Sequence, residues 1–275
     1  MNAMRRERLE KTLARVAREQ GLDQERLRRW VSFLALCGVL ERSLHEGTLT
    51  QYYLKGGVGM ELRFAGAARA TKDLDLALEG DRDQRMAAFT AALGLGFDDF
   101  TFRVKSQVRQ MEVADTVRVK VAVQYRTRNW QTVEVDLGPA EAVEVDLVAP
   151  TIKGLVEMGL PVTSPVRCLG ISEQVAQKLH ACTAPALAGR ARDVLDILLI
   201  EMLGKLDPDK VRAAAELIFA RRGTHTFPPR SELPPMWAPE LETLAKELGF
   251  PLVSASEIQQ KFRSVLEMIA TATAN

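Results

Sequence analysis

The sequence predicts an α+β protein with a mixed sheet, helices at its N-terminus and a helical C-terminal region. Apolar residues first recur at helical spacing, and segments of strand-like alternation then follow between 50 and 148. Helical spacing returns from Thr151 onward. We therefore expect N-terminal helices packed on the core over residues 1–48, a core domain over 49–150 and a helical domain over 151–275.

The composition is that of a globular protein and selects few functions. With 275 residues and 47% apolar content, the chain can bury a sizeable core. The 37 Lys and Arg nearly balance the 36 Asp and Glu, so the net charge favours no nucleic-acid partner, although a local basic patch remains compatible with one. The three cysteines are too scattered for a disulfide framework or a zinc cluster, which favours reduced thiols in a cytoplasmic protein.

Two helices are predicted before residue 45. Leu9, Leu13 and Val16 repeat at helix spacing, Gly21 ends this helix, and Asp23 is placed to cap a second one. The second helix contains the apolar run WVSFLALCGVL, which is too short to cross a bilayer and is flanked by charged residues. We interpret it as a core helix and expect no membrane segment.

The core domain begins with a strand, a turn, a helix and a second strand. Thr50 to Leu54 favours a strand, the glycine pair that follows breaks it, VGMELRF predicts a short helix and KDLDLAL predicts the next strand. A helix from Asp81 to Leu93 follows, and the polar RTRN predicts a hairpin turn. Four strand-like segments complete this region, at 100–108, 117–125, 132–137 and 142–148.

Two aspartates in KDLDLAL lie on one face of the predicted strand. Because successive strand side chains point to opposite faces, Asp73 and Asp75 project together while three leucines enter the core. Carboxylates this close repel each other unless a cation neutralises them, and carboxylate oxygens are ligands that Mg²⁺ prefers. We therefore expect a divalent metal here, Mg²⁺ or Mn²⁺, which also accepts the triphosphate oxygens of an NTP substrate.

A third carboxylate would complete a two-metal site, and two aspartates compete for this place. Asp136 belongs to TVEVDLG, whose apolar and acidic residues alternate cleanly directly after the predicted hairpin. Asp146 belongs to the near-duplicate segment VEVDLV. We favour Asp136 because its strand has a clear inward and outward face.

The glycine pair Gly56–Gly57 predicts a phosphate-binding turn. A turn without Cβ atoms lets backbone amides approach phosphates, and the helix that begins there adds its positive end. Lys55, Arg63 and Arg69 would add positive charge nearby. The segment lacks the last glycine of the Rossmann fingerprint and the lysine and hydroxyl residue of a P-loop, which sets those two motifs aside.

Each of these signals also has a purely structural explanation. A glycine pair is a common turn former, and an alternating Asp/Leu strand is often a half-solvated edge. The order of strand, glycine pair, helix and DxD strand nevertheless favours a nucleotidyltransferase. It disfavours a glycosyltransferase, in which the DxD motif usually follows a long nucleotide-sugar-binding region.

These motifs resemble the signature of the AbiEii nucleotidyltransferase toxins, relatives of the mycobacterial MenT toxins in the polymerase-β-like superfamily. LKGGVGMELRF and RATKDLDL carry the resemblance, VEVDLG is similar to the third-carboxylate strand, and ISEQVAQKLHACTAPALAGRARDVLDILLIE resembles the EKLHA and RDxxDL helices. The match spans roughly Tyr52 to Glu201. It departs at Gln177, where the family has a glutamate, and in the wide spacing from Gly57 to Asp73. The resemblance implies a polymerase-β-like nucleotidyltransferase core.

The helical half contains charged residues on apolar faces. Lys178 falls on such a face and needs an anion; the resemblance implies a triphosphate contact, and a stem that reaches solvent is the structural alternative. Asp193 and Asp196 lie in the first turns of an apolar helix, where burial without a partner is unfavourable. For Asp196 the helix dipole and a pair with Arg192 suffice. For Asp193 the resemblance implies a functional role, and the structural explanation stays open.

The sequence thus predicts a Mg²⁺-dependent enzyme that transfers NMP from an NTP to an acceptor hydroxyl and releases pyrophosphate. The resemblance implies that the acceptor is a tRNA 3′ end, so that aminoacylation is blocked, within a toxin–antitoxin or abortive-infection system whose antitoxin is commonly a helix-turn-helix protein. The alternatives are the same transfer to a protein or small molecule, and a catalytically silent nucleotide-binding module. The expected catalytic residues are Asp73, Asp75, Asp136, Lys178 and Asp193, the first three as metal ligands. The expected nucleotide contacts are Lys55, Gly56, Gly57, Arg63, Arg69, Thr71 and Lys178.

Two groups of basic residues could contact an RNA backbone. One group lies in the N-terminal helices, and the other lies at turns or helix ends and consists of Arg126, Arg128, Arg221 and Arg222. Solvated helix faces explain the same residues. Trp130, beside the hairpin tip, favours a core or rim anchor over a base-stacking platform. His180 has no nucleophile near it in the sequence, so we expect it to be structural.

Overall fold

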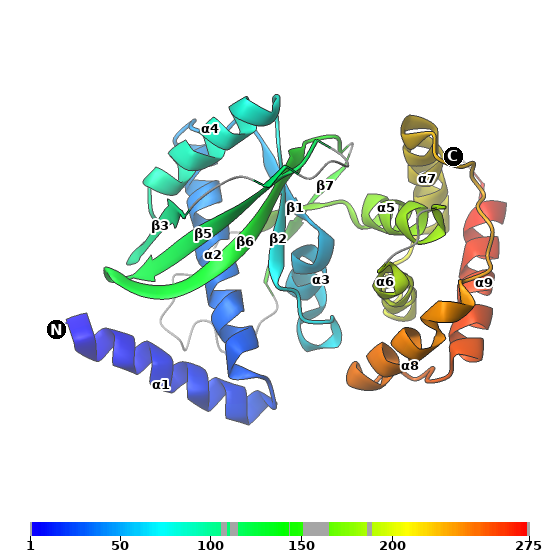
Figure 1. Cartoon of the computed structure of the whole chain (residues 1–275), viewed down its shortest axis with the longest axis horizontal. Coiled ribbons are helices and arrows are strands. Elements are labelled where there is room, and N and C mark those ends of the chain that lie inside the picture. Colours follow the sequence, from blue (N-terminus) through cyan, green and yellow to red (C-terminus); the bar gives the residue numbers. More distant parts are fainter. Residues whose placement is uncertain are drawn as a thin grey trace. The chain divides into compact units, whose positions relative to one another are not determined.

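The computed structural model describes residues 2–105, 109–110, 115–142, 144–150, 165–185 and 189–273. The chain forms two compact units, Met1–Leu169 and Gly170–Asn275 (Figure 1). The first unit contains the sheet together with the N-terminal helices, and the second is helical.

The sheet confirms the mixed α+β architecture. Within the described residues it has eight strands, in the order β3-β5-β6-β2-β1-β8-β7 with β4 paired to β5. Strand β2 is central, antiparallel to β1 and parallel to β6. The strands are β1 Tyr52–Lys55, β2 Asp73–Leu78, β3 Phe100–Val104, β4 Arg109–Gln110, β5 Val117–Tyr125, β6 Arg128–Pro139, β7 Val145–Val148 and β8 Val166–Leu169.

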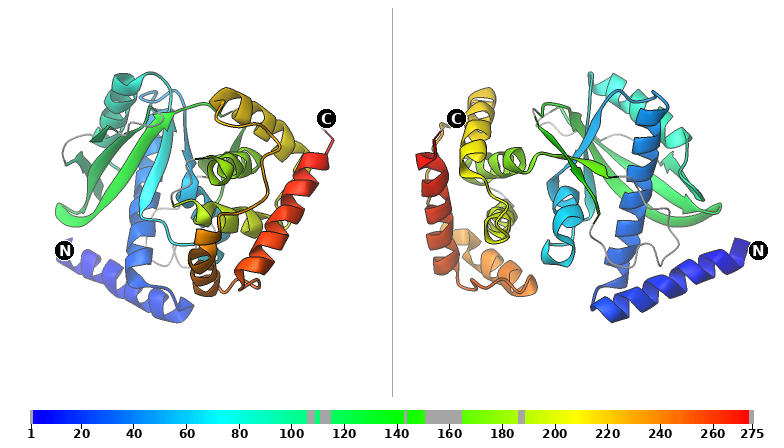
Figure 2. Two further views of the ribbon diagram at one scale, coloured as in Figure 1. Left: turned by 45° about the vertical axis from the view of Figure 1, so that its right-hand side comes forward. Right: turned by 180° about the vertical axis from the view of Figure 1, so that it is seen from behind.

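Helices cover the apolar face of this sheet. The helices of the unit are α1 Asn2–Gln20, α2 Gln24–His45, α3 Gly56–Phe64 and α4 Arg82–Gly94. The short 3-10 helix η1, Ala65–Ala67, directly follows α3. Helices α2 and α4 contact β6 and each other, and Figure 2 shows α2 crossing the sheet when the molecule is seen from behind. The predicted cap is confirmed, because the Asp23 side chain accepts a hydrogen bond from the Arg26 amide. The leucines of β2 enter this core, so its aspartates point to the opposite, open face.

The second unit packs its helices around α5 and α6. Its elements are α5 Ile171–Thr183, α6 Ala191–Met202, α7 Pro208–Arg222, η2 Pro235–Trp237, α8 Ala238–Glu247 and α9 Ala255–Thr271. Helix α5 contacts α6 and α7, and α9 contacts α6, α7 and α8. In the part of the chain that the structure describes, no helix combines the length and the apolar character needed to span a membrane.

Two elements differ from the expectation. Strand β8 adds to β1 in a segment where helical spacing was predicted, because four residues are too few to show a period. Helix α8 starts inside the proline-rich segment Phe227 to Pro239, which the sequence predicts to be a loop, and it has a proline in its first turn, where the missing amide is tolerated. The predicted strand residues 106–108 and the expected start of the helical domain at 151–164 lie outside the described residues.

Candidate active site

Strand register brings the predicted carboxylates together on the open face of the sheet. In the parallel β2–β6 pair, Asp75 lies opposite Asp136 and Asp73 lies opposite Glu134. Residues opposite each other in adjacent strands project from the same face, so these four side chains are neighbours. Asp136 is 7% exposed, whereas Asp73 and Asp75 are half-buried. The fold therefore concentrates negative charge at the start of β2.

The competing carboxylate, Asp146, lies elsewhere in the sheet. It belongs to β7, which two strands, β1 and β8, separate from β2. Its Oδ2 accepts a hydrogen bond of 2.7 Å from an Nη of Arg63, which also donates to the Leu169 carbonyl. Arg63 thus neutralises Asp146 at the β7 edge of the sheet, and β6 lies on the other side of β2. The geometry places Asp136, and not Asp146, beside Asp75.

An arginine that the sequence analysis did not single out lies among the carboxylates. Arg118 of β5 donates two hydrogen bonds to Asp136, 2.7 Å from Nε to Oδ1 and 2.6 Å from Nη2 to Oδ2. The same guanidinium lies 3.8 Å from Asp73 and 3.9 Å from Glu134. Hydrogen bonding to the Asp136 carboxylate raises the pKa of Arg118 above its usual value, which keeps this cation charged. Such a bidentate pair between arginine and carboxylate is stronger than a hydrogen bond between neutral groups.

The glycine pair allows the start of α3 to approach the carboxylates. Gly56 has φ of 62°, and a Cβ there would lie 1.8 Å from Asp75 Oδ2. A Cβ at Gly57 would lie 2.6 Å from Thr71 Oγ1, and that hydroxyl donates to Asp73 Oδ1 at 3.0 Å. Both glycines are therefore required by close packing, and the positive end of α3 lies against Asp75.

The predicted basic contacts divide between this face and other surroundings. Lys55 of β1 lies opposite Asp75 in the register of β1 and β2. A Cβ added at Gly138 of β6 would lie 2.8 Å from Lys55 Nζ. Its ammonium group thus lies on the carboxylate face. Arg63 binds Asp146 with a side chain that is 8% exposed, so its charge is already matched there. Arg69 is half-buried in the connection between η1 and β2.

In the second unit, the remaining candidates bind one another. Lys178 Nζ of α5 donates to Asp193 Oδ1 at 3.0 Å and to Asp196 Oδ2 at 2.6 Å, both in α6. Arg190 also lies 3.4 Å from Asp193. The predicted anion for the apolar-face lysine is therefore supplied by the chain itself, and Asp196 is neutralised by Lys178, where the sequence suggested Arg192. This cluster joins α5 to α6.

His180 is held by structural contacts in the same unit. Its ring contacts Arg222 Nη1 at 3.2 Å and Thr224 Oγ1 at 2.9 Å, and it packs edge-on against Phe219. Burial, together with the charge of Arg222, lowers the pKa of His180 to about 4. The imidazole is therefore neutral near pH 7, and Arg222, one of the candidates for RNA contact, binds it.

At the hairpin tip, one of the two arginines proposed to contact RNA is already bound within the protein. Arg126 forms a salt bridge with Asp99 and its side chain is 9% exposed. Trp130 is buried against Phe100 and Tyr125, so it is a core anchor. Arg128 remains exposed at the start of β6.

Comparisons with known proteins find a family model and similar solved structures. The family model described as "Nucleotidyl transferase AbiEii toxin, Type IV TA system" matches residues 35–272. Among solved structures, the chain is similar to MenT4, a nucleotidyltransferase toxin from Mycobacterium tuberculosis H37Rv, with a TM-score of 0.64 and 18% identity over 95% of this chain and 90% of that one. The antibiotic-resistance factor ANT(2″)-Ia matches with a TM-score of 0.42 and 15% identity over 70% of this chain and 94% of that one. A search of the curated protein sequences finds no match.

Replacing Gly56 by alanine tests the close approach of α3 to Asp75. The positive φ costs an alanine about 1–2 kcal/mol, and its Cβ must displace the Asp75 carboxylate. We expect Gly56→Ala to lower the free energy of unfolding by at least about this amount, measured by urea denaturation. Gly94→Ala in α4 is the matched control, because no atom lies within 4 Å of its added Cβ, and its stability should stay equal or rise slightly. Equal stability of the two variants would contradict the packing argument.

Replacing Lys178 by methionine tests the buried charge cluster. The substitution leaves Asp193 and Asp196 buried without their cation, and breaking a buried ion pair in this way typically costs about 3–5 kcal/mol. We expect a loss of this order in urea unfolding, largely recovered when both aspartates are also changed to asparagine. Lys205→Met, at an exposed position of the same unit, should leave stability unchanged. A Lys178→Met protein as stable as the wild type would show that the cluster does not hold α5 to α6.

Proposed function

The chain belongs to the AbiEii nucleotidyltransferase toxin family of type IV toxin–antitoxin systems, and from this premise we propose that it transfers NMP from an NTP to the 3′ end of tRNA. The resemblance inferred from the motifs is confirmed by the family match over residues 35–272. Membership makes the protein a nucleotidyltransferase toxin and implies an antitoxin partner. The metal, the acceptor and the class of antitoxin are part of the proposal.

The observation that carries the proposal is the register of β2 and β6. It aligns Asp73, Asp75 and Asp136 on one open face, and helix α3 begins directly after the neighbouring strand β1. Hard carboxylate oxygens are the donors that Mg²⁺ prefers. Arg118 already lies as a cation between two of these carboxylates, which supports a site that favours positive charge. The donor set therefore fits Mg²⁺ or Mn²⁺.

The carboxylates match a divalent metal in their ligand type, but their side chains are not arranged around one point. Within the described residues, no three His, Cys, Asp or Glu side chains converge closely enough to hold a metal ion. The bidentate bond to Arg118 accounts for this, because it directs both Asp136 oxygens towards the guanidinium. Asp73, Asp75 and Asp136 would hold the metal once Asp136 turns from Arg118.

The side chains around the carboxylates would position the nucleotide. When bound, the divalent metal neutralises triphosphate charge and lowers the pKa of the acceptor hydroxyl. The start of α3 at the glycine pair presents backbone amides and a positive helix end, which favour phosphate. Lys55 adds an ammonium group on the same face. NMP then passes to the acceptor oxygen as the bond to pyrophosphate breaks, and these fixed charges stabilise the charge on the phosphoryl oxygens.

Lys178 and Asp193 enter the proposal as the candidates of the second unit. The family resemblance assigns Lys178 to the triphosphate and Asp193 to the reaction. Their mutual hydrogen bond supports a joint role, since Asp193 fixes the position of the Lys178 ammonium group. The same bond is also a sufficient structural reason for both residues. Nucleotide transfer by the triple variant described above, in which stability is largely recovered, separates the two roles.

Asparagine substitutions at the two competing aspartates test the carboxylate assignment. We expect Asp136→Asn to reduce NMP transfer at least about 100-fold, because a charged ligand is lost from the face that it shares with Asp75. Asp146→Asn, the matched control, should keep transfer within a few-fold, because Asp146 binds Arg63. Asp73→Asn and Asp75→Asn should behave like Asp136→Asn. Labelled nucleotide transfer and Mn²⁺ binding by electron paramagnetic resonance provide the two measurements, and a reversed order would place the third ligand on β7.

Supplying each labelled NTP with total tRNA, total protein and a metabolite extract tests the acceptor. We expect label at the tRNA 3′ end, absent with Asp73→Asn, and tRNA that no longer accepts an amino acid. Exchange of Arg128 for glutamate should weaken tRNA labelling more than pyrophosphate exchange, because the exposed guanidinium can approach RNA phosphates. Lys246→Glu, exposed on α8, is the charge-matched control. Label on a protein or a small molecule, with tRNA unmodified, would replace the tRNA acceptor by that alternative.

A cognate antitoxin follows from membership of a type IV toxin–antitoxin family. We propose a helix-turn-helix protein for this partner, as the resemblance implies. Co-expression with the neighbouring gene product, followed by recovery of growth, would identify it.

A further inference from the structure

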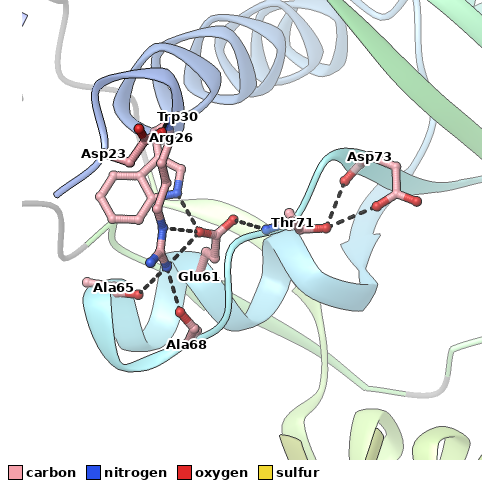
Figure 3. Close-up of polar contacts among 8 residues, drawn as sticks. All are labelled: Asp23, Arg26, Trp30, Glu61, Ala65, Ala68, Thr71 and Asp73. Atoms are coloured by element: carbon pink, nitrogen blue, oxygen red, sulfur yellow. Dashed lines mark hydrogen bonds and ion pairs between the residues drawn. The ribbon is translucent and has the colours of Figure 1, made fainter. Parts of the chain in front are cut away.

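A buried glutamate next to the candidate site joins α2, α3 and the segment before β2. Glu61 of α3 is 2% exposed. Its Oε1 accepts hydrogen bonds of 2.9 Å from Trp30 Nε1 and from Arg26 Nε, and its Oε2 accepts one of 3.1 Å from the Thr71 amide (Figure 3). A carboxylate at this depth is tolerated because these donors replace its hydration. Glu61 thus fixes the backbone of Thr71.

Thr71 passes this constraint on to the candidate metal ligand. Its Oγ1 donates to Asp73 Oδ1 at 3.0 Å, as Figure 3 shows. The Thr71 side chain cannot move towards α3 freely, because it already fills the space that a Cβ at Gly57 would need. The rotamer of Asp73 is therefore set from two residues upstream.

Arg26 holds the connection between α3 and β2 in the same network. Besides Glu61, its Nη2 donates to the carbonyls of Ala65 at 3.3 Å and Ala68 at 2.6 Å. Ala65 has φ of 46°, a conformation that an alanine keeps when its surroundings enforce it. The Arg26 amide in turn donates to the Asp23 cap of α2. The N-terminal end of α2 thereby anchors the whole path from α3 to Asp73.

We infer that Glu61 is a positioning residue that couples the start of α2 to Asp73 through Thr71. This inference rests on the proposed function, in which Asp73 is a metal ligand. Glu61 itself touches neither substrate nor metal. It orients a carboxylate that must present a free oxygen while its other oxygen accepts the Thr71 hydroxyl.

Glu61→Gln in the full chain is the test. Glutamine keeps the size of glutamate, but it offers one acceptor oxygen where Glu61 uses two, so either Thr71 or the Arg26 and Trp30 pair loses its acceptor. We expect about tenfold weaker Mn²⁺ binding and about tenfold lower kcat, with KM for NTP changed less than about twofold. Mn²⁺ binding in the absence of NTP is read by electron paramagnetic resonance.

Thr71→Val is the second variant and serves if Glu61→Gln does not fold. Valine keeps the shape and the amide that binds Glu61 but cannot donate to Asp73, so the same weaker Mn²⁺ binding is expected. Thr71→Ser should restore it, because the hydroxyl returns. Glu41→Gln is the matched control: Glu41 of α2 accepts hydrogen bonds from Tyr52 and Arg167, and its loss should lower stability while Mn²⁺ binding is unchanged.

The outcomes separate the inference from the function on which it rests. Wild-type Mn²⁺ binding in both Glu61→Gln and Thr71→Val, with binding lost in Asp73→Asn, would overturn the positioning role and leave the proposed function intact. Equal loss of Mn²⁺ binding in Glu61→Gln and Glu41→Gln would also overturn it, since general destabilisation would then explain both. Wild-type binding in Asp73→Asn would overturn the metal site and the positioning role together.

Discussion

Repulsion between carboxylates is the constraint on which the first unit depends. Four acidic side chains share the open face of β2 and β6, and strand register prevents them from separating. Like charges opposite one another destabilise a sheet, and the neighbouring strand offsets this. Arg118 of β5 contacts three of the four, and Lys120 lies 3.3 Å from Glu134. The two cations of β5 thus offset the repulsion among the carboxylates of this face.

The same principle shapes the buried parts of both units. Glu61 in the first unit and Lys178 in the second are each surrounded by opposite charge and hydrogen-bond partners. A buried ion pair often adds little net stability compared with an apolar replacement, but removal of one partner is strongly destabilising. Such groups therefore restrict the side chains around them to one arrangement. In the first unit, Glu61 and Arg26 fix the segment between α3 and β2 in this way.

The sequence predicted the parts of the site that depend on local pattern. Alternation alone placed Asp73 and Asp75 on one face, and the hairpin order favoured Asp136, because both follow from the two-residue period of a strand. The contact of Arg118 with Asp136 depends on the register between β5 and β6, which side-chain pattern in one strand does not fix. The partner of Lys178 likewise requires the packing of α5 on α6. Fold class was therefore accessible from the sequence, whereas pairing across elements was not.

The network around Glu61 also bears on where this protein can be shortened. The family match begins at residue 35, after Arg26 and Trp30. A fragment trimmed to the matched region would retain every carboxylate of the sheet, yet Glu61 would lose its neutralising guanidinium and its indole donor. An uncompensated carboxylate at that depth would draw in water or a proton, and the strained turn at Ala65 would lose its support. Helix α2, including its residues before the matched region, thus belongs to the same compact unit as the sheet in this chain.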